Sequence, residues 1–248
     1  MQTQSSSPAP KPVSEVWTPG LVRLPRLTWS RRLFRRFIKF VCRVVLAACT
    51  RAEVRGLENY SRSEPAIVVI NHLGDPDAVL LLAALPDFPE VIGKIELRTI
   101  LRLRLIMGAT GTIWIHRGQA DRRAISAALE AFRQGKRVLI APEGRQSLTG
   151  GLEMGTEGAA FLALKAGVPV VPIALTGTTN RQVYGALKRL HRAQVTLSVG
   201  KPFRLAKSPD RRTAIREGTR AIMEALASLL PPEYRGVYAE GNVPGGTQ

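Results

Sequence analysis

The sequence predicts an α/β protein with a two-layer, mixed and partly parallel sheet, covered by helices and preceded by an N-terminal amphipathic helix. Short apolar, β-branched runs alternate with helical patterns from about residue 50 onwards. A helical pattern with two distinct faces precedes the first of these runs. The chain has 248 residues, 45% of them hydrophobic, which is enough to bury one substantial core.

Four segments are expected along the chain. Residues 1–27 are rich in Ser, Pro, Thr and Gln without periodicity, so we expect a disordered tail. Residues 28–50 form the amphipathic helix and residues 51–230 the α/β domain. Residues 231–248 are rich in Pro and Gly, and we expect a flexible C-terminal tail.

The segment 28–50 repeats apolar and basic residues at three- and four-residue spacing. Such a helix, with aromatic residues on its apolar face, is typical of a membrane surface rich in anionic lipid. The alternative is a helix that packs on the domain and keeps its charged face in solvent; the two can both hold. The apolar stripe comprises Trp29, Leu33, Phe37, Phe40, Val41 and Val44, and the basic stripe comprises Arg32, Arg36, Lys39 and Arg43.

Targeting signals and disulfides are not expected. Residues 30–34 resemble a twin-arginine export signal and residues 46–49 a lipoprotein cleavage site, but Lys39 and Arg43 interrupt the apolar region that such signals need. No uncharged apolar run reaches the roughly 18–20 residues of a spanning helix. Cys42 and Cys49 lie seven residues apart on one helix, too far to bridge, which indicates reduced thiols.

The net charge of +17, from 36 Lys and Arg against 19 Asp and Glu, favours a phosphate-bearing partner. Anionic lipid, an acidic carrier and nucleic acid all fit this charge. A nucleic-acid partner is not expected, because zinc-knuckle spacing and an aromatic RNA-binding submotif are missing and aromatic residues make up 6% of the chain. The sequence also lacks a Gly-x-Ser-x-Gly nucleophile elbow and the Lys-Ser/Thr ending of a P-loop.

The remaining elements follow from periodicity and from turn residues. Apolar runs bounded by polar residues predict strands, and helical periodicity that ends at Gly135 and Gly167 predicts helices. The predicted strands are 51–57 (with a turn), 65–70, 89–94, 111–115, 137–141, 168–175 and 194–199. The predicted helices are 78–85, 97–108, 120–134, 157–166 and 211–230.

Polar side chains follow three of these strands, and ligand groups collect at the carboxyl ends of strands in open α/β sheets. A histidine and an aspartate at a strand-to-helix junction suit a general base whose imidazole is oriented by a carboxylate. Asp75 is an alternative partner, and a helix-capping Asp77 beside a surface histidine is the simpler interpretation. The residues at the three ends are His72 and Asp77, His116 and Arg117, and Glu143, Gly144 and Arg145.

Four blocks in order resemble the glycerolipid acyltransferases that acylate 1-acylglycerol-3-phosphate and related lysophospholipids. Asn71, His72 and Asp77 match the family's Asn-His-x4-Asp block, and Gly111–Arg117 matches Gly-x-Ile-Phe-Ile-Asp-Arg. Ala141–Ser147 matches Phe-Pro-Glu-Gly-Thr-Arg-Ser, and Val171–Ile173 matches a Val-Pro-Ile/Val run. Lys94–Leu97 also resembles the family's Lys-x-Glu-Leu stretch. The resemblance covers roughly residues 50–200.

The resemblance implies that residues 51–230 are an acyltransferase domain, in which His72 is the general base and Asp77 orients it. The acyl donor would be acyl-CoA or acyl-carrier protein, with no cofactor and no metal, at the cytoplasmic face of a membrane to which the protein binds peripherally. Lys94, Arg117 and Arg145 would bind the acceptor phosphate. Glu143 would orient an arginine or an acceptor hydroxyl, and Gly144 would let the backbone approach the ligand.

Two departures from the family pattern bear on the acceptor. His116 replaces the expected Asp, and its side chain either has an unassigned role or is simply solvated. Arg145 comes two residues after Glu143 rather than three. Lysophosphatidic acid is the first choice of acceptor, and another polar lipid, such as an acylated amino-acid lipid, is the second. The alternative of a different class is a basic protein that binds nucleic acid or anionic membrane without catalysis.

Overall fold

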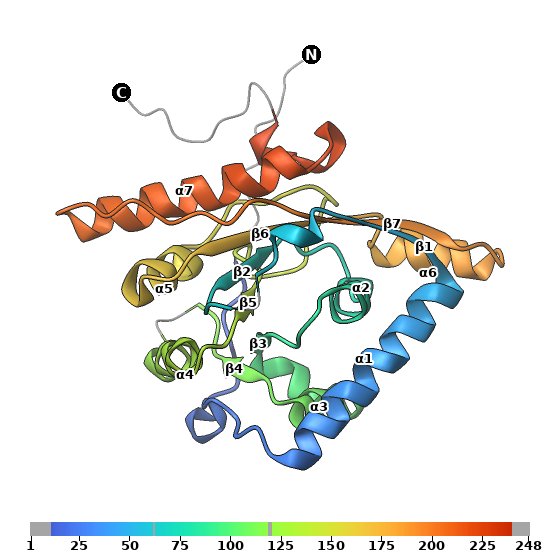
Figure 1. The fold of residues 1–248 in the computed structure, drawn as a ribbon, viewed down its shortest axis with the longest axis horizontal. Coiled ribbons are helices and arrows are strands. Elements are labelled where there is room, and N and C mark those ends of the chain that lie inside the picture. Colours follow the sequence, from blue (N-terminus) through green and yellow to red (C-terminus); the bar gives the residue numbers. More distant parts are fainter. Residues whose placement is uncertain (1–10, 62, 119–120, 240–248) are drawn as a thin grey trace.

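The computed structural model describes residues 11–61, 63–118 and 121–239, and in these residues the protein forms a seven-stranded sheet covered by helices (Figure 1). The strands are β1 (Thr50–Arg55), β2 (Ile67–Ile70), β3 (Glu90–Lys94), β4 (Ile113–Ile115), β5 (Val138–Ile140), β6 (Val170–Thr176) and β7 (Ala193–Val199). The α-helices are α1 (Trp29–Cys49), α2 (Pro76–Ala84), α3 (Leu101–Thr110), α4 (Arg122–Arg133), α5 (Gly158–Ala166), α6 (Asn180–Lys188) and α7 (Arg211–Leu229). Every predicted element is present, and α6 is additional.

The sheet is mixed and mostly parallel, as predicted, with the order β1-β7-β6-β2-β5-β3-β4. Strands β2 to β6 run parallel to one another, whereas β7 is antiparallel to β6 and β1 is parallel to β7. The central strand β2 has β5 on one side and β6 on the other. The chain enters β2 from β1 on the β6 side of the sheet and continues from β2 to β3 on the β5 side. Its carboxyl end is therefore the switch point at which a ligand site is expected.

Helices lie on both faces of the sheet, which adds a layer to the two-layer arrangement expected from sequence. Ile67 and Val69 of β2 point into a core formed with α4, α5 and α7. Val68 and Ile70 point into a second core, formed with α2 and α6. All four side chains are buried, and this explains the continuous apolar run in the sequence of β2.

One row of cations on α1 packs against the domain, namely Arg31, Arg35, Lys39 and Arg43, whereas Arg32 and Arg36 of the predicted basic stripe stay exposed. The helix is therefore docked on the domain with only part of its charged face in solvent. Lys39 donates to the carbonyls of Leu85 and Asp87, and Arg43 donates to the carbonyl of Ala83, so both bind carbonyls at or just beyond the C-terminal end of α2. Cations are favourable at such helix ends, where backbone carbonyls lack intrahelical partners.

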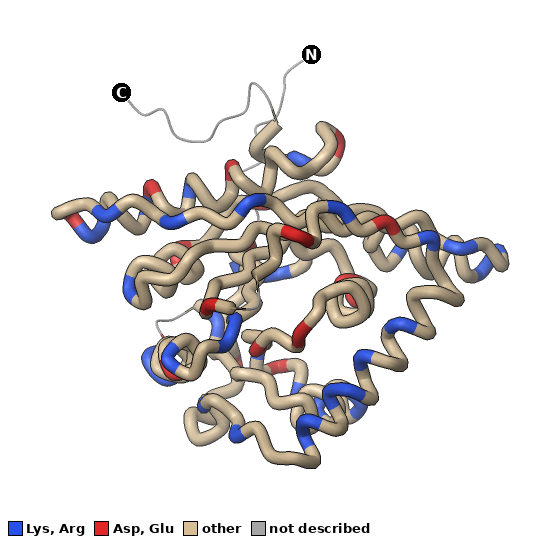
Figure 2. The backbone as a smooth tube through the Cα atoms, in the orientation of Figure 1, with Lys and Arg blue, Asp and Glu red and all other residues tan. Residues whose placement is uncertain are grey.

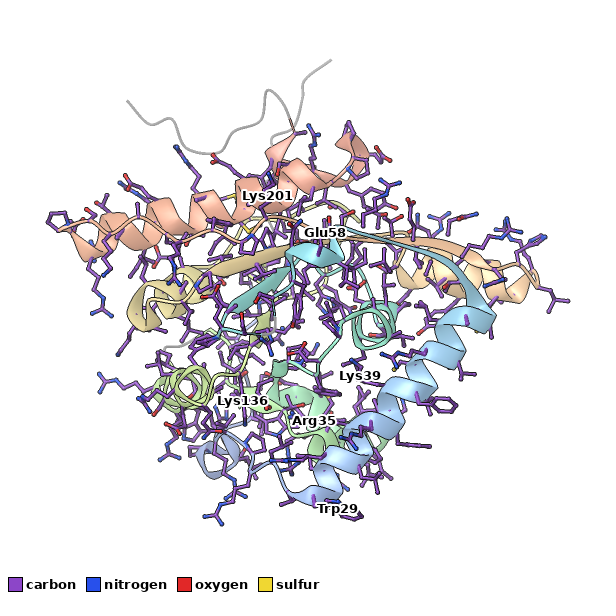
Figure 3. All side chains as sticks on the ribbon, in the orientation of Figure 1. Trp29, Arg35, Lys39, Glu58, Lys136 and Lys201 are labelled. Atoms are coloured by element: carbon purple, nitrogen blue, oxygen red, sulfur yellow. The ribbon has the colours of Figure 1, made fainter. Side chains whose placement is uncertain are left out.

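Arg35 makes the most buried contact of α1. Its guanidinium forms a bidentate ion pair with Glu90 at 3.0 and 2.6 Å, and its Nε donates to the carbonyl of Thr110. Lys136 lies 3.3 Å from the same carboxylate. In Figure 3, Arg35 and Lys39 lie on the side of α1 that faces the domain, whereas Trp29 lies at its outer end.

The apolar stripe of α1 is turned outwards into solvent. Trp29 is 77% exposed and Phe40 63%, and Leu33, Phe37 and Val44 are each more than half exposed. The neighbouring helix α3 adds exposed apolar side chains at Leu101, Leu105 and Ile106. None of the helices in the described ranges has the length and apolar character needed to cross a membrane.

The described parts of both terminal segments contact the domain. Residues 11–27 lie against it: Val22 is buried beside Ile95 and Trp114, and 19–21 form a short 3₁₀-helix. Residues 231–239 also pack on the domain, where Tyr234 accepts a hydrogen bond from the backbone of Gly177. Residues 1–10 and 240–248, which belong to the predicted tails, lie outside the described residues.

Candidate active site

The polar residues singled out in the sequence meet at one edge of the sheet. β2, β3, β4 and β5 are parallel neighbours or near neighbours, so their carboxyl ends face the same way. His72, His116 and Glu143 follow β2, β4 and β5 within three residues, and Lys94 is the last residue of β3. The structure therefore brings together groups that are up to 71 residues apart in the chain.

His72 and Asp77 form a hydrogen-bonded pair at this edge. The His72 Nδ1 lies 2.7 Å from the Asp77 Oδ2, while the histidine side chain is 31% exposed and the aspartate 1%. The same Oδ2 accepts the backbone N–H groups of Leu73 and Gly74, so Asp77 also caps the turn into α2. Asp75 instead accepts a hydrogen bond from the Gln146 side chain. Asp77, rather than Asp75, is thus the partner of His72.

The geometry defines the state in which His72 can act as a base. With Nδ1–H donating to the carboxylate, the imidazole keeps its lone pair on Nε2. In the described part of the chain, Nε2 makes no hydrogen bond, and the partial exposure of the ring leaves it open to a substrate. This is the arrangement of an oriented general base.

Glu143 positions the backbone of His72 rather than contacting solvent. It is fully buried, and its two carboxylate oxygens accept the backbone N–H groups of His72 and Glu153, each at 2.8 Å. Burial raises the pKa of Glu143 to about 7, against the opposing effect of these two hydrogen bonds. In the described part of the chain Glu143 makes no hydrogen bond to an arginine, and its contact with an acceptor hydroxyl stays a prediction.

Asn71, the other residue of the first block, ties β2 to β6. Its side chain donates to the carbonyl of Leu175 and accepts the backbone N–H of the same residue, at 2.9 and 2.7 Å. The backbone of His72 is further held because its carbonyl accepts the N–H of Ser147. Contacts from three neighbouring segments therefore hold His72 in place. The sequence alone did not indicate these contacts.

Arg145 lies at the site but is paired with a carboxylate. Its Nε donates to the Glu153 Oε2 at 2.7 Å, and Lys11 lies 3.3 Å from the same oxygen. Glu153 also accepts the backbone N–H of Leu148. Neither Glu153 nor Lys11 stood out in the sequence, because a single carboxylate and a single lysine outside a motif carry no signal.

Arg117 and Gly144, which belong to two different blocks of the family pattern, are in contact. The Arg117 Nη1 donates to the Gly144 carbonyl at 3.4 Å, and its Nη2 lies 3.8 Å from Glu96. Gly144 has φ +74°, and a Cβ there would meet only Thr156 at 3.7 Å, so the backbone conformation is what requires glycine among the described residues, and close approach of a ligand stays a prediction. Lys94 is exposed at the end of β3.

His116 is buried rather than solvated. Its ring is 0% exposed, its Nδ1 lies 2.7 Å from the Asp121 Oδ2, and its Nε2 accepts the backbone N–H of Thr18 at 3.0 Å. The indole of Trp17 lies on the ring, with 4.4 Å between centroids. Asp121 follows His116 by five residues, as Asp77 follows His72, and this repeated spacing was the available sequence signal.

A metal centre is not supported by the described residues, among which three or more His, Cys, Asp or Glu side chains never gather with metal-binding geometry. The site therefore consists of an oriented imidazole with a free Nε2 and a set of cations, Lys11, Lys94, Arg117 and Arg145, two of which, Lys11 and Arg145, share Glu153. Such a site can remove a proton from a substrate that carries negative charge.

A family model described as Acyltransferase matches residues 51–176, which is half of the chain. The chain belongs to the acyltransferase family. The four sequence blocks, from Asn71 to Ile173, lie within the matched range, so the resemblance drawn from them is confirmed.

Curated relatives and a solved structure agree with this assignment. A 1-acyl-sn-glycerol-3-phosphate acyltransferase of Chlamydomonas reinhardtii is 32% identical over 217 residues, covering 85% of this chain and 62% of the relative. A chloroplastic enzyme of the same name from Arabidopsis thaliana is 30% identical over 184 residues, covering 72% of this chain and 51% of the relative. This acyltransferase thus spans about half to three fifths of their length.

The fold is shared with a crystal structure of the 1-acyl-sn-glycerophosphate acyltransferase PlsC from Thermotoga maritima. The two chains superpose with a TM-score of 0.61 at 21% identity, and the match covers 80% of this chain and 81% of that one. At this identity the likeness establishes the α/β fold of the acyltransferase and leaves its acceptor to be inferred from the site.

Proposed function

We propose that this acyltransferase transfers an acyl chain from acyl-CoA or acyl-carrier protein to the hydroxyl of a lysophospholipid. The first-choice acceptor is 1-acyl-sn-glycerol-3-phosphate, which would give phosphatidic acid. The observation that carries the proposal is the His72–Asp77 pair, with its free Nε2 at the same sheet edge as Arg117 and Arg145. The names of the relatives support a phosphate-bearing acceptor.

The reaction follows from the protonation state of His72. Its Nε2 removes the proton from the acceptor hydroxyl as the oxygen attacks the thioester carbonyl, and Asp77 stabilises the imidazolium that forms. The new ester C–O bond forms, the C–S bond breaks, and His72 returns the proton to the leaving thiolate. Arg117 and Lys94 attract the head group, so the hydroxyl is held close to Nε2.

The outward face of α1 supports a peripheral position on a membrane, and we place the protein on the cytoplasmic face. Six large apolar side chains of α1 and three of α3 form exposed apolar surface of the kind that marks a lipid interface. The α1 segment carries Lys and Arg but no Asp or Glu along its length (Figure 2). Arg32 and Arg36 are exposed and are available to anionic head groups.

The proposed reaction is tested by free thiol release from acyl-CoA, with and without added lysolipid. The full-length protein should release thiol only when an acceptor is present, and fastest with lysophosphatidic acid. Faster release with a neutral or amino-acid lysolipid would move the acceptor to another polar lipid. Complete absence of release with every lysolipid, from both acyl-CoA and acyl-carrier protein, would contradict the proposal.

The membrane contact is tested by replacing two exposed aromatic residues, Phe37→Ser and Phe40→Ser, in one protein. Sedimentation with anionic vesicles should weaken by about tenfold or more, since each exposed Phe contributes about 1–2 kcal/mol on entering the interface. Leu190→Ser is the matched control, because Leu190 is 96% exposed on the loop after α6. Equal vesicle binding by the two variants would contradict the role of α1.

A further inference from the structure

Residues 11–18, called the strap here, cross the acceptor side of the active site. The backbone N–H of Ser14 donates to the Arg117 carbonyl at 3.0 Å, and the Ser14 Oγ accepts the Arg117 N–H at 2.7 Å. Gly118 has φ +80°, and a Cβ there would lie 2.6 Å from a methyl group of Val13. The strap is thus fitted closely to the end of β4, where the second block of the acyltransferase pattern lies.

His116 latches the strap to the domain. Its Nδ1 is turned to the Asp121 carboxylate, which also accepts the backbone N–H of His116, so its Nε2 is an acceptor. This acceptor receives the backbone N–H of Thr18, and Trp17 covers the ring. The residue that departs from the family pattern is therefore the residue that holds the strap in place.

The latch brings Lys11 to the cations of the acceptor site. Lys11 and Arg145 bind the same oxygen of Glu153, at 3.3 and 2.7 Å. Arg117 contacts the carbonyl of Gly144, the residue before Arg145, and faces Glu96 at 3.8 Å. Lys94 acts on the same Glu96 carboxylate, so three cations face Glu96 and Glu153 before Lys11 is counted. Lys11 adds a further positive charge to this cluster.

The cluster also contains three buried polar atoms that lack a hydrogen-bond partner among the described residues, the Arg117 Nε and both carboxylate oxygens of Glu96. The Arg117 Nε is buried and makes no hydrogen bond in the described part of the chain. Buried donors of this kind are costly unless a ligand or an ordered water satisfies them. A phosphate monoester would supply both the acceptor oxygen for this donor and the negative charge that the excess of cations favours.

We propose that the strap is part of the acceptor site and that Lys11, placed by the His116 latch, helps to bind the phosphate of the acceptor. This inference rests on the proposed function and names an additional binding residue for it. His116, Trp17 and Ser14 act through the strap and are positioning residues. The contribution of Lys11 is electrostatic, so it should depend on the negative charge of the acceptor head group.

Steady-state kinetics of the full-length protein tests the role of Lys11. Lys11→Ala should raise the KM for lysophosphatidic acid about fivefold with kcat little changed, the effect of losing roughly 1 kcal/mol from a partly exposed charge contact. Lys11→Arg should restore the KM. Lys201→Ala is the matched control, since Lys201 is an exposed lysine on the loop after β7 (Figure 3). A KM for Lys11→Ala equal to that of Lys201→Ala would overturn the proposal.

The latch is tested by loosening the strap without removing a buried group. Trp17→Ala removes a half-exposed indole from the His116 ring and should raise the acceptor KM as Lys11→Ala does. Combining the two substitutions should add little, because Lys11 no longer reaches the site once the strap is free. Fully additive effects would show that Lys11 and the latch act independently, which contradicts the proposal.

Hydrogen exchange of the peptide 11–18 separates this inference from the proposed reaction. Addition of glycerol 3-phosphate should slow exchange in wild-type protein, and inorganic phosphate should do so less if the glycerol part is also recognised. Unchanged exchange with both anions would overturn the strap proposal. If wild-type protein shows no lysolipid-dependent thiol release, the proposed reaction fails, and the exchange result still decides whether the strap belongs to an anion site.

Discussion

The protein contains two His-x4-Asp pairs with nearly the same geometry and very different surroundings. In both, Nδ1 lies 2.7 Å from an aspartate Oδ2. The Nε2 of His72 reaches a partly exposed edge, whereas the Nε2 of His116 is buried and accepts a backbone N–H. The comparison shows that the pairing makes an oriented imidazole, and that the access to Nε2 decides whether it serves as a base or as a structural acceptor.

The largest expected effect on activity is that of removing the His72 side chain. His72→Ala should lower kcat for lysolipid-dependent thiol release by about 10²–10⁴-fold, the usual contribution of a general base. The variant should stay folded, because its side chain is partly exposed. His191→Ala, on an exposed loop, is the control. Activity of His72→Ala within threefold of wild type would remove His72 from the mechanism.

Substitution of Asp77 and Asp121 is expected to have the next largest effect, and to affect kcat in one His–Asp pair and stability in the other. Asp77→Asn should lower kcat by about 10²-fold, because the amide oxygen retains the hydrogen bonds but cannot stabilise an imidazolium. Asp121→Asn should leave kcat within a fewfold of wild type. It should instead lower the stability by about 1–2 kcal/mol, because Asp121 also caps α4. Thermal unfolding measures this loss, and a comparable fall in kcat for both variants would break the comparison.

A smaller effect is expected at Glu143, which holds the backbone of His72 and has no counterpart at His116. Its folded-state pKa of about 7 lies above its usual value near 4.5, so the folded protein binds this proton more tightly than the unfolded chain. Stability from this group is present below pH 4.5 and is lost as the pH rises through 7. The loss is at most about 3 kcal/mol.

Glu143→Gln isolates this dependence. The variant loses a backbone acceptor at every pH, so its free energy of unfolding is offset from wild type, and the pH dependence of the difference is the measured quantity. Between pH 4.5 and 7 the wild type should lose more stability than the variant. Parallel curves from urea unfolding across this range would show that Glu143 does not titrate there.

The pattern of strands and helices could be predicted because each element carries its own periodicity. The run 65–70 is apolar at every position since β2 is buried on both faces, and Gly135 and Gly167 follow helices that end where predicted. The base and its carboxylate were also predictable, since five residues separate them across one turn. The short helix α6 was missed although Val183, Ala186 and Leu187 form an apolar stripe, because a helix of nine residues shows too few turns for its periodicity to stand out.

Contacts between distant segments could not be predicted. The composition of 1–27, rich in Ser, Pro, Thr and Gln, indicated disorder, but hydrogen bonds to Arg117 and His116 hold residues 14 and 18, and Val22 is buried in a small core. The alternation of apolar and basic residues in α1 likewise did not reveal which face turns inward. That choice depends on the carbonyls of α2 and on the buried Glu90, which lie elsewhere in the chain.

The attachment of α1 to the domain at both of its halves has a mechanical consequence. The helix ends at Cys49 and β1 begins at Thr50, so no linker residue separates them, and Arg35 fixes the other half through a buried ion pair. A helix clamped at both halves cannot pivot. If α1 rests on a lipid surface as proposed, the tilt of the edge that carries His72 is therefore set when the chain folds, and so is the distance from His72 to that surface.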